Sequence, residues 1–167
     1  AAAGTETVYT WGWQIEVGAF ATSYIPTVAS TVTRSADAAR MDGTNFSDWY
    51  NQSEGTFVVE GDRMGADVQF IAAQTNSNNR MVLRGSSGAF FFIYNSAVLQ
   101  KDFTTVGSFG ANVPVKVSGA YKLNDSNHAI NGTAGAADVA CTIPAVNQLA
   151  FFISSGSVRT NGHIASL

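Results

Sequence analysis

The sequence predicts an all-β protein, either a β-sandwich or a β-barrel. First, apolar and polar residues alternate with a period of two in segment after segment, as in half-buried strands. Second, roughly ten such segments follow one another at intervals of about 8–14 residues, the spacing typical of sandwiches and barrels. Third, the chain has 16 glycines, only 13% charged residues and no long helical pattern.

The composition bounds the function. The 167 residues are enough for one domain with a buried core. The net charge is −3 and the nine Lys and Arg residues are scattered, so we expect no nucleic-acid partner. No apolar stretch reaches the length of a membrane span, so we expect no membrane insertion. The single cysteine, Cys141, lies in an apolar stretch and is expected in the core. Because the chain begins without Met, we expect a fragment, a processed product or the ordered part of something longer.

The N-terminal part predicts a strand and a linker. Over residues 8–17 the alternation places aromatic and aliphatic side chains on one side of an extended strand. Such a stripe must pack on something, so these residues are candidates for assembly contacts: Tyr9, Trp11, Trp13 and Ile15. Residues 18–32 have weak periodicity and are predicted to be a linker, and residues 35–41 form one helical turn at most. The predicted domains are therefore 1–32, the strand and linker, and 33–167, the sandwich.

The rest of the chain predicts strands joined by turns rich in Gly, Asn and Ser. In the segment 80–84 we expect Met81 and Leu83 to face the core and both arginines to face outward. In the segment 113–122 we expect Val113, Val115, Val117, Gly119 and Tyr121 to face inward. The predicted strands cover residues 55–60, 68–73, 80–84, 89–94, 97–105, 113–122, 128–130, 138–143, 148–153 and 161–167.

The sequence supports catalysis and metal binding only weakly. The two histidines, His128 and His163, have no nucleophile motif beside them and are expected to be structural or surface residues. Glu60 and Asp62 share a strand face, as the two acids of a sandwich glycosidase do, but without flanking aromatic residues. We therefore expect no catalytic residues and no enzyme. No cofactor is expected either. Calcium stays an alternative, with turn capping as the simpler role of the candidate aspartates Asp42, Asp48, Asp62 and Asp67.

Sugar binding is the chemistry that the sequence favours. It needs aromatic faces for the apolar side of a pyranose and amides or guanidinium groups for its hydroxyls. Two clusters offer them, each with a turn or packing role as the alternative; Trp49 and Tyr50 in particular can cap the end of the sandwich. The candidates are Trp49, Tyr50 and Asn51 in the first cluster, and Asn76, Asn78, Arg80, Arg84 and Tyr94 in the second.

Three segments carry a family resemblance. Residues 11–27 (WGWQIEVGAFATSYIPT) and 31–37 (TVTRSAD) resemble a pattern that recurs in bacteriophage tail and fibre proteins. Residues 49–60 (WYNQSEGTFVVE) look like the first strand of the concanavalin A-like, or laminin-G-like, jelly roll that follows this pattern. Residues 161–164 (NGHI) are similar to the closing strand of that domain.

The resemblance implies a concanavalin-like jelly-roll β-sandwich of antiparallel strands with an N-terminal strand and linker. It also implies a non-catalytic virion domain that acts outside the cell and binds a host cell-surface polysaccharide. Phage fibres are commonly trimers, so other virion subunits and copies of this chain are expected partners. Residues 1–17 are then the last strand of a preceding β domain, or a strand that docks elsewhere. The alternatives are a structural or assembly module of the virion and the carbohydrate-binding module of a polysaccharide-degrading enzyme.

Overall fold

The computed structural model describes residues 7–16, 23–33, 39–63, 68–85, 89–103, 110–151 and 162–166. The chain divides into two compact units, a first unit of Ala1–Asp37 and a second of Ala38–Leu167. The predicted domain limits at residues 32 and 33 stay a prediction. In the described residues, no helix has the length and apolar character needed to cross a lipid bilayer.

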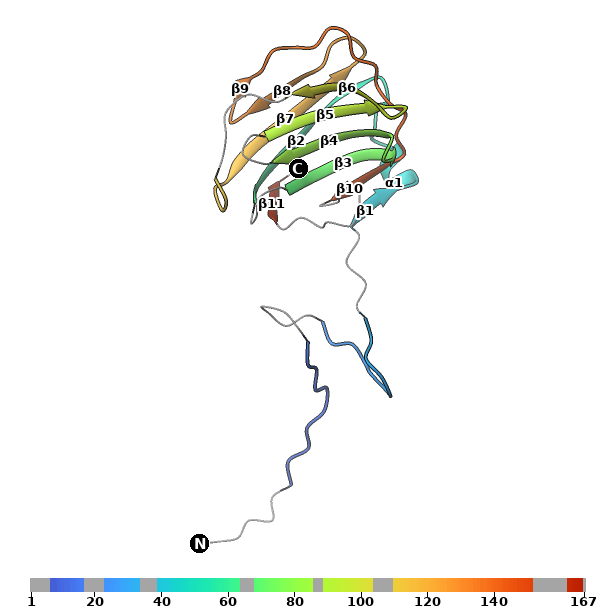
Figure 1. The fold of residues 1–167 in the computed structure, drawn as a ribbon, viewed down its shortest axis with the longest axis vertical. Helices are drawn as coiled ribbons and strands as arrows, with labels where there is room; N and C mark the ends of the chain where they lie inside the picture. Colours follow the sequence, from blue (N-terminus) through green and yellow to red (C-terminus); the bar gives the residue numbers. More distant parts are fainter. Residues whose placement is uncertain are drawn as a thin grey trace. The chain divides into compact units, whose positions relative to one another are not determined.

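The second unit is a sandwich of two antiparallel sheets, which confirms the predicted all-β fold (Figure 1). The six-stranded sheet has the order β1 (Arg40–Asp42), β10 (Gln148–Phe151), β3 (Val68–Asn76), β4 (Asn79–Gly85), β5 (Ala89–Asn95) and β6 (Val98–Phe103). The five-stranded sheet has the order β11 (Gly162–Ser166), β2 (Glu54–Arg63), β7 (Val115–Lys122), β8 (Asn127–Ile130) and β9 (Thr133–Ala134). A single helical turn, α1 (Thr44–Ser47), follows β1.

The core lies between the inner faces of the two sheets. Alternate residues of β4 and β5, including Met81, Leu83, Phe91 and Ile93, are almost fully buried there, as the period-two pattern predicts. The sheets approach closely at Gly119 of β7, where an added Cβ would lie 2.6 Å from the ring of Phe91. Only glycine leaves room for that ring, so the small residue at this position is a packing requirement.

Three places among the described residues differ from the predicted elements. Arg40 and Met41, predicted to lie in one helical turn at most, belong to strand β1, and a helical turn lies at Thr44–Ser47; residues 35–38 of that predicted turn lie outside the described residues. No strand forms over 138–143; Asp138 makes one isolated bridge to Ser126 instead. Val113, predicted to face inward, precedes β7 and is 46% exposed. Within the segment 138–143 only Cys141 is buried, whereas Val139, Ala140 and Thr142 are exposed, so the alternation of residue types does not correspond to a strand with one buried side.

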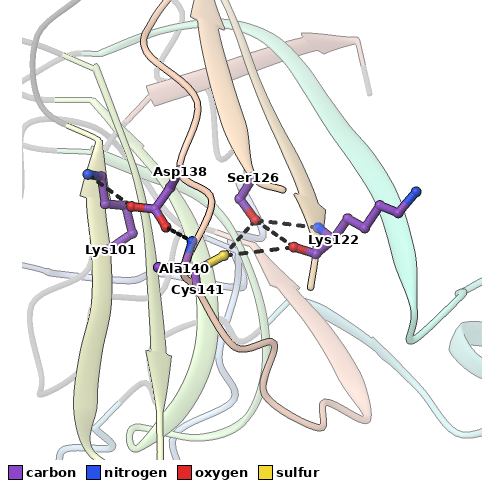
Figure 2. Close-up of polar contacts among 6 residues, drawn as sticks. All are labelled: Lys101, Lys122, Ser126, Asp138, Ala140 and Cys141. Carbon is purple, nitrogen blue, oxygen red and sulfur yellow. Dashed lines mark hydrogen bonds and ion pairs between the residues drawn. The ribbon is translucent and has the colours of Figure 1, made fainter. Parts of the chain in front are cut away.

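Polar contacts fasten this segment to the sandwich (Figure 2). The Asp138 carboxylate pairs with Lys101 Nζ at 3.1 Å and accepts a hydrogen bond from the Ala140 amide at 2.9 Å. The Ser126 hydroxyl lies 2.9 Å from the Cys141 sulfur and donates to the Lys122 carbonyl. Cys141 is fully buried, which confirms its predicted place in the core.

The first unit contains no strand among the residues that the structure describes, 7–16 and 23–33. Gly12 has a φ of 72°, a left-handed conformation that interrupts the extended alternation predicted for residues 8–17. The Gln14 side chain accepts a hydrogen bond from the Ile25 amide at 2.8 Å, and Trp11 packs edge-on against Tyr24. Because side-chain contacts replace a sheet ladder, the predicted N-terminal strand does not form over residues 8–16; Val17 lies outside the described residues.

Candidate functional site

The outer face of the six-stranded sheet presents one polar side chain from each of five neighbouring strands. The register aligns Asp42 with Gln148, Gln148 with Gln74, Gln74 with Arg80 and Arg80 with Tyr94. We call these five residues the outer row. They face away from the core because the residues beside them in the register pack inside it: Met41, Leu149, Ala73, Met81 and Ile93.

One end of the outer row borders a small hollow, the arginine cavity, of about 130 Å³. The guanidinium carbon of Arg80 lies 4.9 Å from the ring centre of Tyr94 and 5.4 Å from that of Phe92. The guanidinium carbon of Arg84 lies 5.9 Å from the same Phe92 ring. Phe92 is therefore only 8% exposed on an outward-facing position. The cavity is lined by Gln69, Arg80, Arg84, Phe92, Tyr94, Leu99 and Asp102.

The electrostatics of this cavity are unusual for a sheet surface. Burial lowers the pKa of Arg80, which the nearby Tyr94 partly offsets and the like charge of Arg84 reinforces. The Nε of Arg80 is shielded from solvent and has no hydrogen-bond partner within the described part of the chain. The second predicted sugar-binding cluster thus keeps three of its members together: Arg80, Arg84 and Tyr94.

The other end of the outer row borders a larger hollow beside α1, the α1 cleft, of about 510 Å³. Arg40 and Asp42 form an ion pair of 2.8 Å at its edge, with both side chains more than half exposed. Gln52 is fixed in its wall, because its amide donates to the Pro144 carbonyl and accepts from the Val146 amide. The cleft is lined by Arg40, Asp42, Gly43, Phe46, Ser47, Tyr50, Gln52, Val146, Asn147 and Gln148.

In the first predicted cluster the capping role is seen at Tyr50, and sugar binding stays a prediction. Tyr50 stacks on Phe46 at 4.5 Å and on Tyr121 at 5.9 Å, so it closes the end of the sandwich. Burial raises the pKa of Tyr50, and Tyr121 adds to this shift. Tyr50 also lines the α1 cleft. Trp49 is 51% exposed and fixed by a hydrogen bond to the Asn45 carbonyl, whereas the Asn51 side chain accepts from the Ser53 amide.

The asparagines of the second cluster build a turn instead. The Asn76 side chain accepts hydrogen bonds from the amides of Asn78 and Asn79 at 2.9 and 3.0 Å. The side chain of Asn79 in turn accepts from the Ser96 amide across the neighbouring turn. Asn76 and Asn78 are therefore structural in this turn, and the structure does not bring them to the arginine cavity.

The residues considered for catalysis lie on different parts of the sandwich where the structure describes them. Glu60 and Asp62 lie on the outer face of the five-stranded sheet, where Lys116 Nζ lies 3.4 Å from the Glu60 carboxylate. His128 is buried against Phe103, and the side chain of His163 is outside what the structure describes. Among the described residues, no three His, Cys, Asp or Glu side chains gather as metal ligands. Asp67 lies outside those residues.

Several residues of the site were not predicted as sugar ligands: Gln74, Phe92 and Gln148. Local counting does not find Gln74. Asn76 faces Asn79 beside the turn, so counting back along both strands would pair Thr75 with Arg80, and a register shift between Gln74 and Asn76 places Gln74 opposite Arg80 instead. Gln148 could not be found in this way, because its neighbour β3 lies about seventy residues away in the chain.

Comparison with known proteins addresses the fold. No protein-family model matches the sequence, and neither does any curated protein. Domains LG4-5 of the mouse laminin α1 chain superpose with a TM-score of 0.58 over 77% of this chain, at 6% identity. A Bacillus licheniformis β-glucanase superposes with a TM-score of 0.51 over 67% of this chain, at 10% identity. The chain has a concanavalin-like jelly-roll fold. It spans 39% of the laminin chain and 64% of the glucanase chain.

Proposed function

We propose that the protein binds carbohydrate on the outer face of the six-stranded sheet, with a sugar ring held in the α1 cleft. The observation that carries the proposal is the cleft itself. Its volume of about 510 Å³ lies in the usual range of small-molecule sites. It combines the aromatic side chain of Tyr50 with the amides of Asn147 and Gln148 and the Arg40–Asp42 ion pair. The β-glucanase neighbour, an enzyme named for a glucan, adds a precedent on the same fold.

The polar groups of the cleft suit sugar hydroxyls. The Gln148 side chain makes no hydrogen bond among the described residues, so its donor and acceptor are available to a ligand. Asp42 and Arg40 hold each other in a fixed orientation, presenting a carboxylate acceptor beside guanidinium donors. The role proposed is binding without catalysis and without a cofactor. The ion pair of Glu60 with Lys116 supports that role, because a carboxylate paired with a lysine is a poorer general acid.

The test is isothermal titration of the full chain with neutral oligosaccharides chosen from a glycan array. We expect Gln148→Ala and Asp42→Ala each to weaken binding about two- to tenfold, as the loss of one hydrogen bond predicts. Thr56→Ala, on the outer face of the other sheet, is the matched control and should leave the affinity unchanged. Equal effects of all three variants, or an array without hits, would contradict the proposal.

The biological setting that we propose is attachment of a phage tail or fibre to a host cell-surface polysaccharide, outside the cell. The support is the resemblance of residues 11–37 to a pattern of such proteins. The purified chain is expected to bind intact bacteria of a susceptible host and to lose binding after periodate oxidation of the surface glycans. Binding that survives periodate but is lost after protease treatment would contradict this setting.

Assembly is a second candidate function, because a specific observation favours it. In the first unit Tyr9, Trp11 and Trp13 are 90%, 87% and 79% exposed, and Ile15 is fully exposed. Large aromatic groups left in water favour burial against another subunit. We expect the full chain to be an oligomer, with a trimer as the predicted state, and the double variant Trp11→Ser/Trp13→Ser to be a monomer by light scattering. An unchanged mass would remove these residues from any assembly contact.

A further inference from the structure

We propose that the carbohydrate is an extended acidic polysaccharide that crosses the strands along the outer row and places a carboxylate or sulfate group in the arginine cavity. This inference rests on the proposed function, since it assumes a sugar ring in the α1 cleft. It adds the chemical class of the ligand, its direction on the sheet and a second contact region.

The outer row connects the two hollows. Asp42 and Gln148 line the α1 cleft, and Arg80 and Tyr94 line the arginine cavity. Gln74 lies between them in the register. Strands are spaced by about 4.8 Å, so five strands carry the row over roughly 19 Å, which a short oligosaccharide can cover. The ligand must therefore lie across the strands, because only that direction follows the row.

The middle of the row is open to a ligand. The side-chain amide of Gln74 makes no hydrogen bond among the described residues, and neither does that of Gln148. Both side chains are partly exposed. Each amide has donors and an acceptor that suit successive sugar hydroxyls. A neutral stretch of the polysaccharide is thus accommodated between the two hollows.

The arginine cavity suits an anionic substituent rather than a sugar ring. Its volume of about 130 Å³ is well below the range of sites that enclose a whole small molecule. Two guanidinium groups approach the same Phe92 ring, whereas Asp102 contributes a single negative charge to the lining. The planar fork of an arginine matches the oxygens of carboxylate and sulfate in bidentate geometry. The Nε of Arg80 is buried and has no hydrogen-bond partner among the described residues, so an anion held beside this guanidinium would supply one.

The opposite sheet differs in how its described lysines are placed. On its outer face the two lysines are neutralised across the strands, Lys122 by Glu54 at 3.0 Å and Lys116 by Glu60 at 3.4 Å. A general attraction of acidic chains to any basic surface would not distinguish the two faces. Lys122 consequently provides the matched control for the arginines.

The experiment titrates the full chain with three hexasaccharides: an oligogalacturonate, its carboxyl-reduced neutral counterpart and a sulfated galactan fragment. We expect at least one acidic probe to bind about tenfold or more tightly than the neutral one. Arg80→Gln should remove this advantage, Arg80→Lys should restore only part of it, and Lys122→Gln should leave it intact. Gln74→Ala should weaken binding of the hexasaccharide but not of the corresponding disaccharide. Thermal unfolding monitored by circular dichroism verifies that each variant is folded.

The outcomes separate the two proposals. Equal affinity for the acidic and neutral probes would overturn the inference. If Gln148→Ala still weakens binding of the neutral hexasaccharide in that case, the proposed function stands. An equal loss with Lys122→Gln and Arg80→Gln would also overturn the inference, because the attraction would then be general. If no probe binds at all, both proposals fail.

Discussion

The outer faces of the two sheets are both exposed surfaces of the jelly roll, but their charged side chains have different partners. The five-stranded sheet pairs opposite charges across β2 and β7, with Glu54 on Lys122 and Glu60 on Lys116. The hydrogen bond from Lys122 to Glu54 raises the pKa of that lysine. The six-stranded sheet instead lays Arg80 over the aromatic rings of Phe92 and Tyr94.

The difference indicates which of the two outer faces is better suited to bind an acidic ligand. A cross-strand ion pair balances its own two charges, so it leaves little net charge to attract an acidic ligand. A guanidinium stacked on an aromatic ring keeps its donors directed outward while its stem covers apolar surface. A low overall charge is therefore compatible with binding of an acidic ligand, because such binding can depend on a few cationic side chains.

The largest difference between the two faces is expected in the free energy of unfolding when one apolar residue on each is replaced by alanine. Phe92→Ala removes a ring that is nearly buried under the arginines, and we expect a loss of about 3–5 kcal/mol in the free energy of unfolding. Val58→Ala on the five-stranded sheet changes a side chain that is half exposed, and we expect at most about 0.5 kcal/mol. Urea unfolding measures both. Similar values for the two variants would show that the outer faces are packed alike.

A smaller effect separates the cations. Arg80→Ala should cost about 1–2 kcal/mol, because both the cation–π contact and the packing of the stem on Phe92 are lost. Lys116→Ala breaks an exposed ion pair and should cost within about 0.5 kcal/mol. The same urea titration compares them, and added salt should reduce the effect of Lys116→Ala alone. A larger cost for Lys116→Ala would reverse the comparison.

The smallest effect is a gradual change of stability with pH, and it concerns His128 in the core between the two sheets. His128 is buried against Phe103, and neither ring nitrogen has a hydrogen-bond partner among the described residues. Burial lowers its pKa below the ordinary 6.5, so the unfolded chain binds the proton more readily than the folded one. The contribution of neutral His128 to the free energy of unfolding is therefore fully present above about pH 6.5, the ordinary pKa of histidine. It is lost as the pH falls through the lower pKa of the folded protein.

The measurement is the melting temperature between pH 7.5 and pH 5. His128→Leu should flatten the curve in this window, because an apolar side chain of similar size cannot take up a proton. Loss of stability that persists unchanged in His128→Leu would place the titrating group elsewhere, on either outer face.

Much of the fold could be predicted from the sequence. Met81 and Leu83 alternate with Arg80 and Arg84 in a segment whose periodicity leaves one arrangement, and the structure confirms it. The same reasoning was wrong for the segment 138–143, because its residue types alternate although only Cys141 is buried and a single bridge, from Asp138 to Ser126, forms there. A strand also needs a backbone partner along its length, which lies elsewhere in the chain and which alternation does not reveal.

The candidate site was predicted in part for the same reason. Arg80, Arg84 and Tyr94 come from neighbouring strands joined by a short turn, so local register brings them together. The α1 cleft depends on the pairing of β10 with β1 and β3, which no local pattern specifies. The residue types of the proposed carbohydrate site were thus visible in the sequence, but their arrangement in a row was not.

The position of β10 between β1 and β3 also bears on synthesis of the protein. During translation Asp42 and Gln74 leave the ribosome long before Gln148, so β3 has an open edge for most of that time. Only when residues 148–151 emerge can β1 be joined to the sheet and the α1 cleft close. Chains that end early are left with arginines but no cleft, and with an edge that invites aggregation. The proposed site therefore predicts that retention on a carbohydrate column selects molecules that include residues 148–151 from a mixture with shorter ones.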